Sequence, residues 1–262
     1  MPISRDEMAL LADQLYDARI ERKACAPLTT THPAITLADA YIISDINMRR
    51  RTEQAGIKLI GKKIGLTSRA VQKQLEVEQP DFGYLTSDMN IPLGGLAPIE
   101  KLLQPRVEGE VAFMLKKDLM GPGITAAHVI SATEFVLPCI EIIDSRIKDW
   151  KIKVEDTVAD NASSAYFVLG ASPRNLGFQD LRMAGMALRI NGEVMSTGVG
   201  MACLDHPVNA VAWLANTMGS YGVALKAGEI ILSGAFGPVV PVKSGDHCEV
   251  EISGLGTVYC NF

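Results

Sequence analysis

The sequence has 262 residues, of which 48% are hydrophobic and 21% are charged, enough to bury the core of one compact domain. Its formal net charge of −5 argues against nucleic acid and anionic membrane surfaces as partners, and therefore favours a small ligand. No apolar run reaches the length of a membrane span, and acidic residues interrupt the N-terminus where a signal peptide would be apolar, so we expect a cytoplasmic protein.

The first 75 residues predict a helical N-terminal part with one strand. Ser4 and Glu7 have the spacing of a capping box, and apolar residues follow at helical intervals, namely Met8, Leu11, Leu15 and Ala18. A second helix is expected to begin after Thr36 and to end near Arg49–Arg51, a run that we interpret as a solvated helix end. The stretch "KLIGKKIGLTS" then reads as a strand that leads into a short helix over residues 69–75.

From about residue 100 to 262 the pattern changes to short strands bounded by turn residues. Asn191-Gly192, between two apolar alternations, is a strong signal for a β-hairpin. Two helices are expected to interrupt the strands, over residues 125–137 and 207–222. Helices first and strands later, with no repeating βαβ rhythm, indicate an α+β fold, which we expect to form a single domain over residues 1–262.

The stretch "PRVEGEVAFML" places Glu108 and Glu110 two positions apart in an otherwise apolar strand. Side chains at i and i+2 share one face of a strand, so the two carboxylates lie close enough to repel each other. One interpretation is a solvent-exposed strand face, where water screens the repulsion. The other is a buried pair that holds Mg²⁺ or Mn²⁺, because apolar neighbours on both faces indicate a covered strand.

A metal site would need a third acidic residue, and "PCIEIIDSR" contains two candidates. Glu141 is the better ligand because isoleucines surround it in a short apolar strand. Asp144 reads as a turn residue or as an ion-pair partner of Arg146. The pattern E-x-E plus a later acid is weak by itself, so the metal remains one of two open interpretations.

Lysine and aspartate candidates come from two segments before residue 100. Lys63 lies in a strand-like run beside glycines, which would let it point into a cleft; the alternative is an edge-strand lysine with its amine in water. Lys62 is interpreted as a solvated neighbour. Asp81 follows Pro80 in "QPDFGYL", where it either contributes to a site or bonds the backbone of a turn.

Polar residues also stand next to apolar strands farther along the chain. Asn161 and Ser163 precede the strand "AYFVLG" and indicate a polar loop at the mouth of a strand. Ser233 ends the strand "GEIILSG", where the glycines let backbone amides approach a ligand. These three residues are candidates for substrate binding.

Nearly the whole chain resembles one family. The segments "GKKIGLTSRAVQKQL", "QPDFGYLTSDM", "QPRVEGEVAFMLKKDLMGPGIT", "PCIEIIDSRIKDWKIKVEDTVADNASS" and "GEIILSGAFGPVVPV" are similar to the 2-hydroxypenta-2,4-dienoate hydratases (2-oxopent-4-enoate hydratases) of aromatic meta-cleavage pathways. This group belongs to the fumarylacetoacetate hydrolase-like superfamily, as do the related 2-oxo-3-hexenedioate (4-oxalocrotonate) decarboxylases. "QPDFGYL" and "SGAFGP" favour the hydratase branch, whereas "NASS" resembles the decarboxylase form.

The resemblance implies a mixed, largely antiparallel β core and a divalent-metal-dependent hydratase. It assigns the metal, Mg²⁺ or Mn²⁺, to Glu108, Glu110 and Glu141, and the catalytic roles to Lys63 and Asp81. The implied substrate is a small 2-hydroxy or 2-oxo dienoate, and water addition gives 4-hydroxy-2-oxopentanoate. The family also implies a homo-oligomer that can associate with the decarboxylase or aldolase of its pathway.

Two other functions are weighed against the hydratase. The first is the decarboxylase, which acts on a longer dicarboxylate and would need a further cationic contact. The second is a noncatalytic partner subunit, which loss of the acidic residues or of the lysine would have favoured. All of these residues are present, so this interpretation ranks last.

Overall fold

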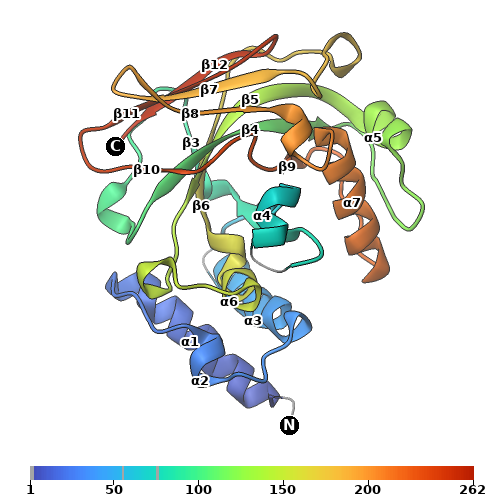
Figure 1. Ribbon diagram of the computed structural model, residues 1–262. Helices are drawn as coiled ribbons and strands as arrows, with labels where there is room; N and C mark the ends of the chain where they lie inside the picture. Colours follow the sequence, from blue (N-terminus) through green and yellow to red (C-terminus); the bar gives the residue numbers. More distant parts are fainter. Residues whose placement is uncertain (1–2, 55, 75–76) are drawn as a thin grey trace.

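The computed structural model describes residues 3–54, 56–74 and 77–262, and it places a group of helices beneath a two-sheet β core (Figure 1). The helices are α1 (Arg5–Glu21), α2 (Leu28–Thr31), α3 (Leu37–Arg49), α4 (Arg69–Gln74), α5 (Ala126–Ala132), α6 (Val154–Ala159) and α7 (Pro207–Ser220). The strands are β1 (Leu59–Gly65), β2 (Asp81–Thr86), β3 (Asn90–Ile91), β4 (Arg106–Leu115), β5 (Thr133–Ile143), β6 (Ser164–Leu169), β7 (Gly185–Ile190), β8 (Glu193–Val199), β9 (Ile230–Leu232), β10 (Val240–Pro241), β11 (His247–Ile252) and β12 (Gly256–Asn261).

The N-terminal helices have a hydrophobic core of their own. The predicted capping box of Ser4 and Glu7 is present at the start of α1, and Thr36 forms a second one with Asp39 at the start of α3. α3 packs on both α1 and α6, and α2 packs on α6. The apolar residues of these helices are buried together, among them Leu11, Leu15, Leu28, Ala40, Ile43 and Val158. Within the described ranges, no helix is both long and apolar enough to cross a membrane.

The larger sheet is curled so that one of its faces points inward. Its strand order is β2-β1-β9-β4-β5-β6-β3, with β10 on β4, and all pairs are antiparallel except β1–β9 and β3–β6. The two edge strands, β2 and β3, are joined by Ser87–Met89 alone, so the edges must lie close together. The inward face carries apolar side chains, including Leu85, Met89, Ala112, Leu137, Phe167 and Leu232. The expected mixed, largely antiparallel core is confirmed.

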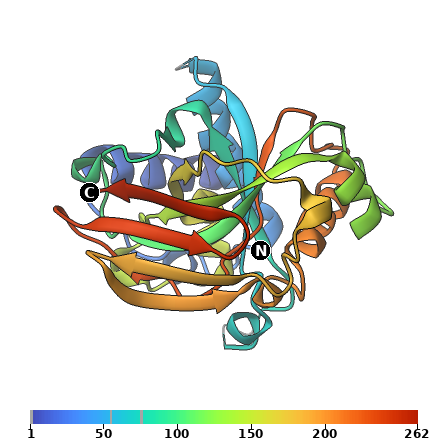
Figure 2. The ribbon, with the colours of Figure 1, turned by 90° about the horizontal axis from the view of Figure 1, so that it is seen from above.

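The second sheet, with strand order β12-β11-β7-β8, packs on the outer face of β4 and β5 (Figure 2). Gly109 permits this close approach, since a Cβ at that position would lie 2.8 Å from Cγ1 of Val250. β7 and β8 form the predicted hairpin, in which Asn191 and Gly192 both have positive φ, 54° and 86°. α5 and α7 lie against each other beside this core (Figure 1).

One predicted helix is shorter in the structure, and the structure describes only part of another. The helix expected over residues 125–137 ends at Ala132, and residues 133–137 begin β5 instead. Val136 pairs with Phe113 and Leu137 with Ala112 of β4, so pairing with a distant strand overrides the local helical pattern. α4 begins at Arg69 as expected, while Leu75, at its predicted end, lies outside the described residues.

Candidate metal and catalytic site

Three glutamates converge on the inward face of the larger sheet. Glu108 and Glu110 lie on β4, and Glu141 lies directly opposite Glu108 on the neighbouring strand β5. Directly opposed residues of antiparallel strands point to the same face, so all three side chains project inward. One carboxylate oxygen from each lies within 4.8 Å of the others. The structure therefore brings together the three residues that were proposed as metal ligands.

Two of these carboxylates lack hydrogen bonds that burial normally requires. Glu110 and Glu141 are 0% exposed, and Oε1 of Glu110 and both oxygens of Glu141 have no hydrogen-bond partner among the described residues. Oε2 of Glu110 accepts from the Gly234 amide at 2.8 Å. Burial and then the charge of Glu141 raise the pKa of Glu108 to about 8, and they raise the pKa of Glu110 well above its ordinary value.

A divalent cation would relieve both the repulsion and the missing hydrogen bonds. The donor set consists of three carboxylates with no cysteine or histidine in the cluster, which matches the ligands of Mg²⁺ and Mn²⁺ rather than those of zinc. The residues present thus fit a hard divalent cation.

Lys63 points toward this acidic cluster from β1. The strand lies between β2 and β9, so Lys63 is not on an edge, and its side chain is buried. Its Nζ donates to the Ala162 carbonyl at 3.0 Å and lies 3.3 Å from Oε2 of Glu141. Burial acts to lower the pKa of Lys63, but the carboxylates, Glu141 foremost, raise it above its ordinary value. The lysine is therefore held in its charged form.

The interpretation of Lys62 as a solvated lysine is wrong. It points away from Lys63, is 2% exposed, and donates to both carboxylate oxygens of Glu229 at 2.6 and 2.7 Å. Both faces of β1 are covered, because Lys62 on one face and Lys63 on the other are buried. The ion pair with Glu229 compensates for the burial of the charge.

Asp81 begins β2 directly opposite Gly65 of β1. It is buried, and its Oδ1 has no hydrogen-bond partner among the described residues. A Cβ at Gly65 would lie 2.2 Å from this oxygen and 3.4 Å from Nζ of Lys63, so the absence of a side chain at Gly65 leaves room for both groups. Burial raises the pKa of Asp81, while Lys63 opposes the shift.

A left-handed turn, Asn161–Ser163, presents the Ala162 carbonyl to Lys63. The φ angles of its three residues are 55°, 50° and 55°, a conformation that costs about 1–2 kcal/mol per residue for side chains other than glycine. The Asn161 side chain accepts from the Tyr84 amide at 2.7 Å and donates to the Tyr84 carbonyl at 3.0 Å. These bonds fasten the turn to β2 and occupy the amide group of Asn161.

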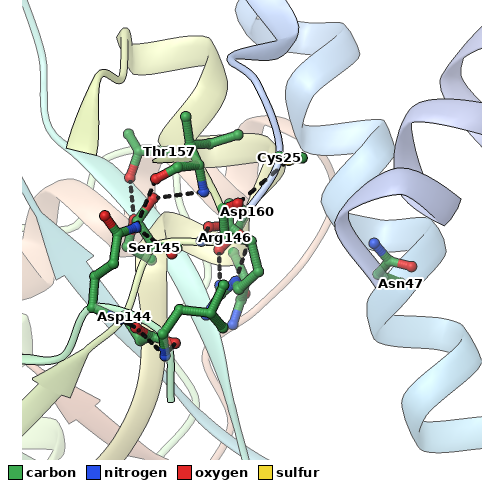
Figure 3. Close-up of polar contacts among 12 residues, drawn as sticks. Cys25, Asn47, Asp144, Ser145, Arg146, Thr157 and Asp160 are labelled. Carbon is green, nitrogen blue, oxygen red and sulfur yellow. Dashed lines mark hydrogen bonds and ion pairs between the residues drawn. The ribbon is translucent and has the colours of Figure 1, made fainter. Parts of the chain in front are cut away.

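A buried ion pair holds the other side of the left-handed turn (Figure 3). Nε of Arg146 donates to the Asp160 carboxylate. A second guanidinium nitrogen donates to the Asp160 carbonyl at 2.6 Å, and the Arg146 backbone amide donates to the Asp160 carboxylate at 2.9 Å. The suggested partnership of Arg146 with Asp144 is therefore wrong. Asp144 instead accepts from the backbone amides of Leu103 and Gln104, the turn-type role that was its other interpretation.

The two candidate serines differ in their surroundings. Oγ of Ser163 shares a hydrogen bond of 3.0 Å with Oγ1 of Thr157. Oγ of Ser233 is buried and has no partner among the described residues, and the next amide, that of Gly234, binds Glu110. Ser233 is consequently the better placed of the two to meet a ligand beside the glutamates.

Sequence reasoning missed the backbone groups of Ala162 and Tyr84 in this site. The contribution of Ala162 is its carbonyl oxygen, and Tyr84 contributes an amide and a carbonyl. Every residue type has these groups, so the sequence carries no signal for them. Only the unusual φ angles of the left-handed turn mark the place.

This chain is similar to known proteins over most of its length. Residues 61–262 match the family described as "Fumarylacetoacetate (FAA) hydrolase C-terminal". The chain is 51% identical to a 2-hydroxyhexa-2,4-dienoate hydratase from Comamonas testosteroni over 251 residues, 95% of each chain. It is 56% identical to a 2-hydroxypent-2,4-dienoate hydratase from Pseudomonas putida over 218 residues, which are 82% of this chain and 96% of that one.

Among solved structures, a 4-oxalocrotonate decarboxylase from Pseudomonas putida G7, complexed with magnesium and adipate, superimposes with a TM-score of 0.95 at 38% identity. The superposition covers 99% of this chain and 98% of that one. The shared fold, the family match and the identity to the two hydratases lead to one conclusion: this chain belongs to the fumarylacetoacetate hydrolase family, in the group that contains these dienoate hydratases.

Proposed function

We propose that this chain is a divalent-metal-dependent hydratase that converts 2-hydroxypenta-2,4-dienoate into 4-hydroxy-2-oxopentanoate, with residues 1–262 acting as one catalytic unit. The observation that carries the proposal is the convergence of three buried carboxylates, two of which have oxygens without a hydrogen-bond partner among the described residues, with Lys63 and Asp81. The identity of 51% and 56% to hydratases of dienoates supports the choice of reaction.

Glu108, Glu110 and Glu141 would hold the metal, for which we propose Mg²⁺ or Mn²⁺. When bound, the ion supplies Lewis acidity that favours the 2-oxo form of the substrate and draws electrons toward its 2-oxygen. The magnesium in the related decarboxylase structure supports a cation of this class.

The reaction requires a proton to leave the 2-oxygen, a proton to reach C5, water to add at C4 and a proton to reach C3. The Lys63 ammonium would stabilise negative charge on the 2-oxygen, since the acidic surroundings keep it protonated. Asp81, whose pKa is raised, would exchange protons with the carbon chain or orient the water through Oδ1.

Three residues would bind the substrate carboxylate or shape its site. Oγ of Ser233 is free to donate to the carboxylate. Asn161 and Ser163 are engaged with Tyr84 and Thr157, so we assign them the role of fixing the left-handed turn beside the substrate. Of the three, Ser233 is the one that we expect to change substrate affinity directly.

The second candidate function is decarboxylation of 2-oxo-3-hexenedioate, because the chain superimposes so closely on the 4-oxalocrotonate decarboxylase. That substrate has a second carboxylate, which would need a cation in addition to Lys63. A noncatalytic partner subunit is the last candidate, and the complete set of acidic and basic residues argues against it.

One assay separates these functions. Each substrate is supplied with the purified protein and Mg²⁺ or Mn²⁺, and both dienol absorbance and carbon dioxide are followed, with the E110Q variant as the inactive control. Loss of the dienol without carbon dioxide supports the hydratase. Release of carbon dioxide would identify the decarboxylase, and no turnover of either substrate would refute both enzymatic functions.

The proposal extends to location and assembly. Five free cysteines, four of them buried, are typical of a reducing compartment, which supports the cytoplasm. Large apolar side chains are exposed on the surface, for example Phe178 at 87% and Leu96 at 71%, and these support a homo-oligomer. Association with the decarboxylase or aldolase of the pathway would use the same kind of surface.

A further inference from the structure

A cavity lies between the N-terminal helices and the β core. Its volume is about 540 Å³, and its walls come from α1, α3 and residues 50–57 on one side and from β6 and its preceding turn on the other. Figure 3 shows Asn47 of α3 opposite Arg146 and Asp160, which all line this cavity. Asn161, which fixes the left-handed turn beside the substrate, lines it, whereas none of the described residues assigned to metal binding or catalysis does.

The lining of this cavity is cationic although the chain as a whole is acidic. The three carboxylates that line it are already engaged: Asp88 by Arg51, Asp160 by Arg146, and Asp144 by two backbone amides. Against these stand six cationic side chains, Arg19, Arg22, Arg50, Arg51, Lys101 and Arg146. The walls therefore carry more positive charge than their own acids neutralise.

Several donors in the cavity have no acceptor. Arg19 makes no ion pair or hydrogen bond with any described residue, and burial, followed by the charges of Arg51 and Arg146, lowers its pKa to about 10. Nε of Arg51 and Oγ of Ser164 are buried without a hydrogen-bond partner in the described part of the chain. Ser164 is only 5% exposed, and both residues line the cavity. Donors left in this state normally meet a ligand or ordered water.

We propose that this cavity is a second binding site, separate from the metal site, for a small oxyanion such as a carboxylate or phosphate held by Arg19, Arg51 and Ser164. Planar guanidinium groups match the oxygens of both anions and form charge-assisted hydrogen bonds with them. The volume lies in the range of small-molecule sites. The inference rests on the cavity alone and does not depend on the proposed hydratase reaction.

The position of this site connects it with the catalytic lysine. Ser164 directly follows the left-handed turn, whose Ala162 carbonyl accepts from Lys63. Arg146 and Asp160, which hold the turn, also line the cavity. An anion bound to Ser164 would therefore contact the opposite side of the three-residue turn that positions Lys63.

Calorimetric titration of the magnesium-loaded protein tests the proposal, with inorganic phosphate in one arm and succinate in the other. We expect saturable binding of at least one anion, and the arm that binds identifies the preferred oxyanion. R19Q and S164A should each weaken binding by about tenfold or more, the expected effect of losing a charge-assisted or buried hydrogen bond. R5Q, which removes the same charge from an exposed position on α1, should leave the affinity unchanged.

The metal site is the main competing location, and E110Q addresses it. Binding in the cavity should persist in E110Q, whereas binding at the metal site should be lost. The proposal is overturned if neither anion binds saturably, if R19Q and S164A both bind as the wild type does, or if only E110Q loses binding. Circular dichroism and a thermal melt of each variant show whether it is folded. If R19Q does not fold, S164A tests the anion site alone, because it removes only an unpaired hydroxyl.

Discussion

Replacing Glu110 with glutamine separates the stability that bound metal adds from the stability of the metal-free protein. The substitution keeps the size of the side chain and its bond from the Gly234 amide, but it removes one of three buried carboxylates that face one another. Without metal, these groups repel and the pKa of Glu110 is raised by burial and then by Glu141 and Glu108. We therefore expect metal-free E110Q to be at least as stable as the metal-free wild type at pH 8.

Added metal should stabilise the wild type more than it stabilises E110Q. At a free metal concentration 100 times the dissociation constant, binding stabilises the folded wild type by about 2.7 kcal/mol. For a chain of this size, each kcal/mol raises Tm by about 2–4 °C, so the metal should raise the wild-type Tm by about 5–11 °C. E110Q lacks one ligand, and we expect most of this increase to disappear together with turnover.

Differential scanning calorimetry with EDTA, Mg²⁺ and Mn²⁺ measures both quantities. E193Q, at an exposed position of the β7–β8 hairpin, is the matched control and should respond to metal as the wild type does. An E110Q variant that keeps the full metal-induced rise in Tm, or that turns over at the wild-type rate, would show that Glu110 is not a ligand.

Four further substitutions test the surroundings of the metal site. K63M should lower kcat by about 100-fold or more, the usual cost of removing a group that stabilises developing negative charge. K62M, its control, should lower stability and leave kcat unchanged. Equal losses of kcat in the two variants would contradict the catalytic role of Lys63. G65A should displace Asp81, whose Oδ1 lies 2.2 Å from the added Cβ, and reduce kcat by up to about 100-fold; unchanged steady-state kinetics would remove Asp81 from the mechanism. R146M leaves Asp160 buried without its cation and should cost about 3–5 kcal/mol in urea unfolding; a loss below about 1 kcal/mol would show that this pair does not hold the left-handed turn.

Local patterns predicted several parts of the structure and the site correctly. The capping box at Ser4 and the cap residue Thr36 mark where α1 and α3 begin, since a cap bonds groups only a few residues along the chain. The two-residue period of a strand put Glu108 and Glu110 on one face, and the apolar neighbours of Glu141 indicated its burial. These inferences needed no knowledge of distant partners.

Inferences about charged partners failed where the partner comes from far along the chain. Lys62 finds Glu229, which is 167 residues away, and the sequence does not show that β1 becomes an interior strand. Arg51, interpreted as part of a solvated helix end, contacts Asp88 and lines the cavity between the N-terminal helices and the β core. A cavity between two packed units depends on how those units meet, and no local pattern records that.

Anomalous diffraction from crystals of the protein with Mn²⁺ tests the central claim most directly, because it locates the cation itself. We expect a single strong peak between the carboxylates of Glu108, Glu110 and Glu141, with metal–oxygen distances of about 2.0–2.5 Å. A peak at other residues, or no peak at this position in crystals of active enzyme, would contradict the claim that these three glutamates hold the catalytic metal.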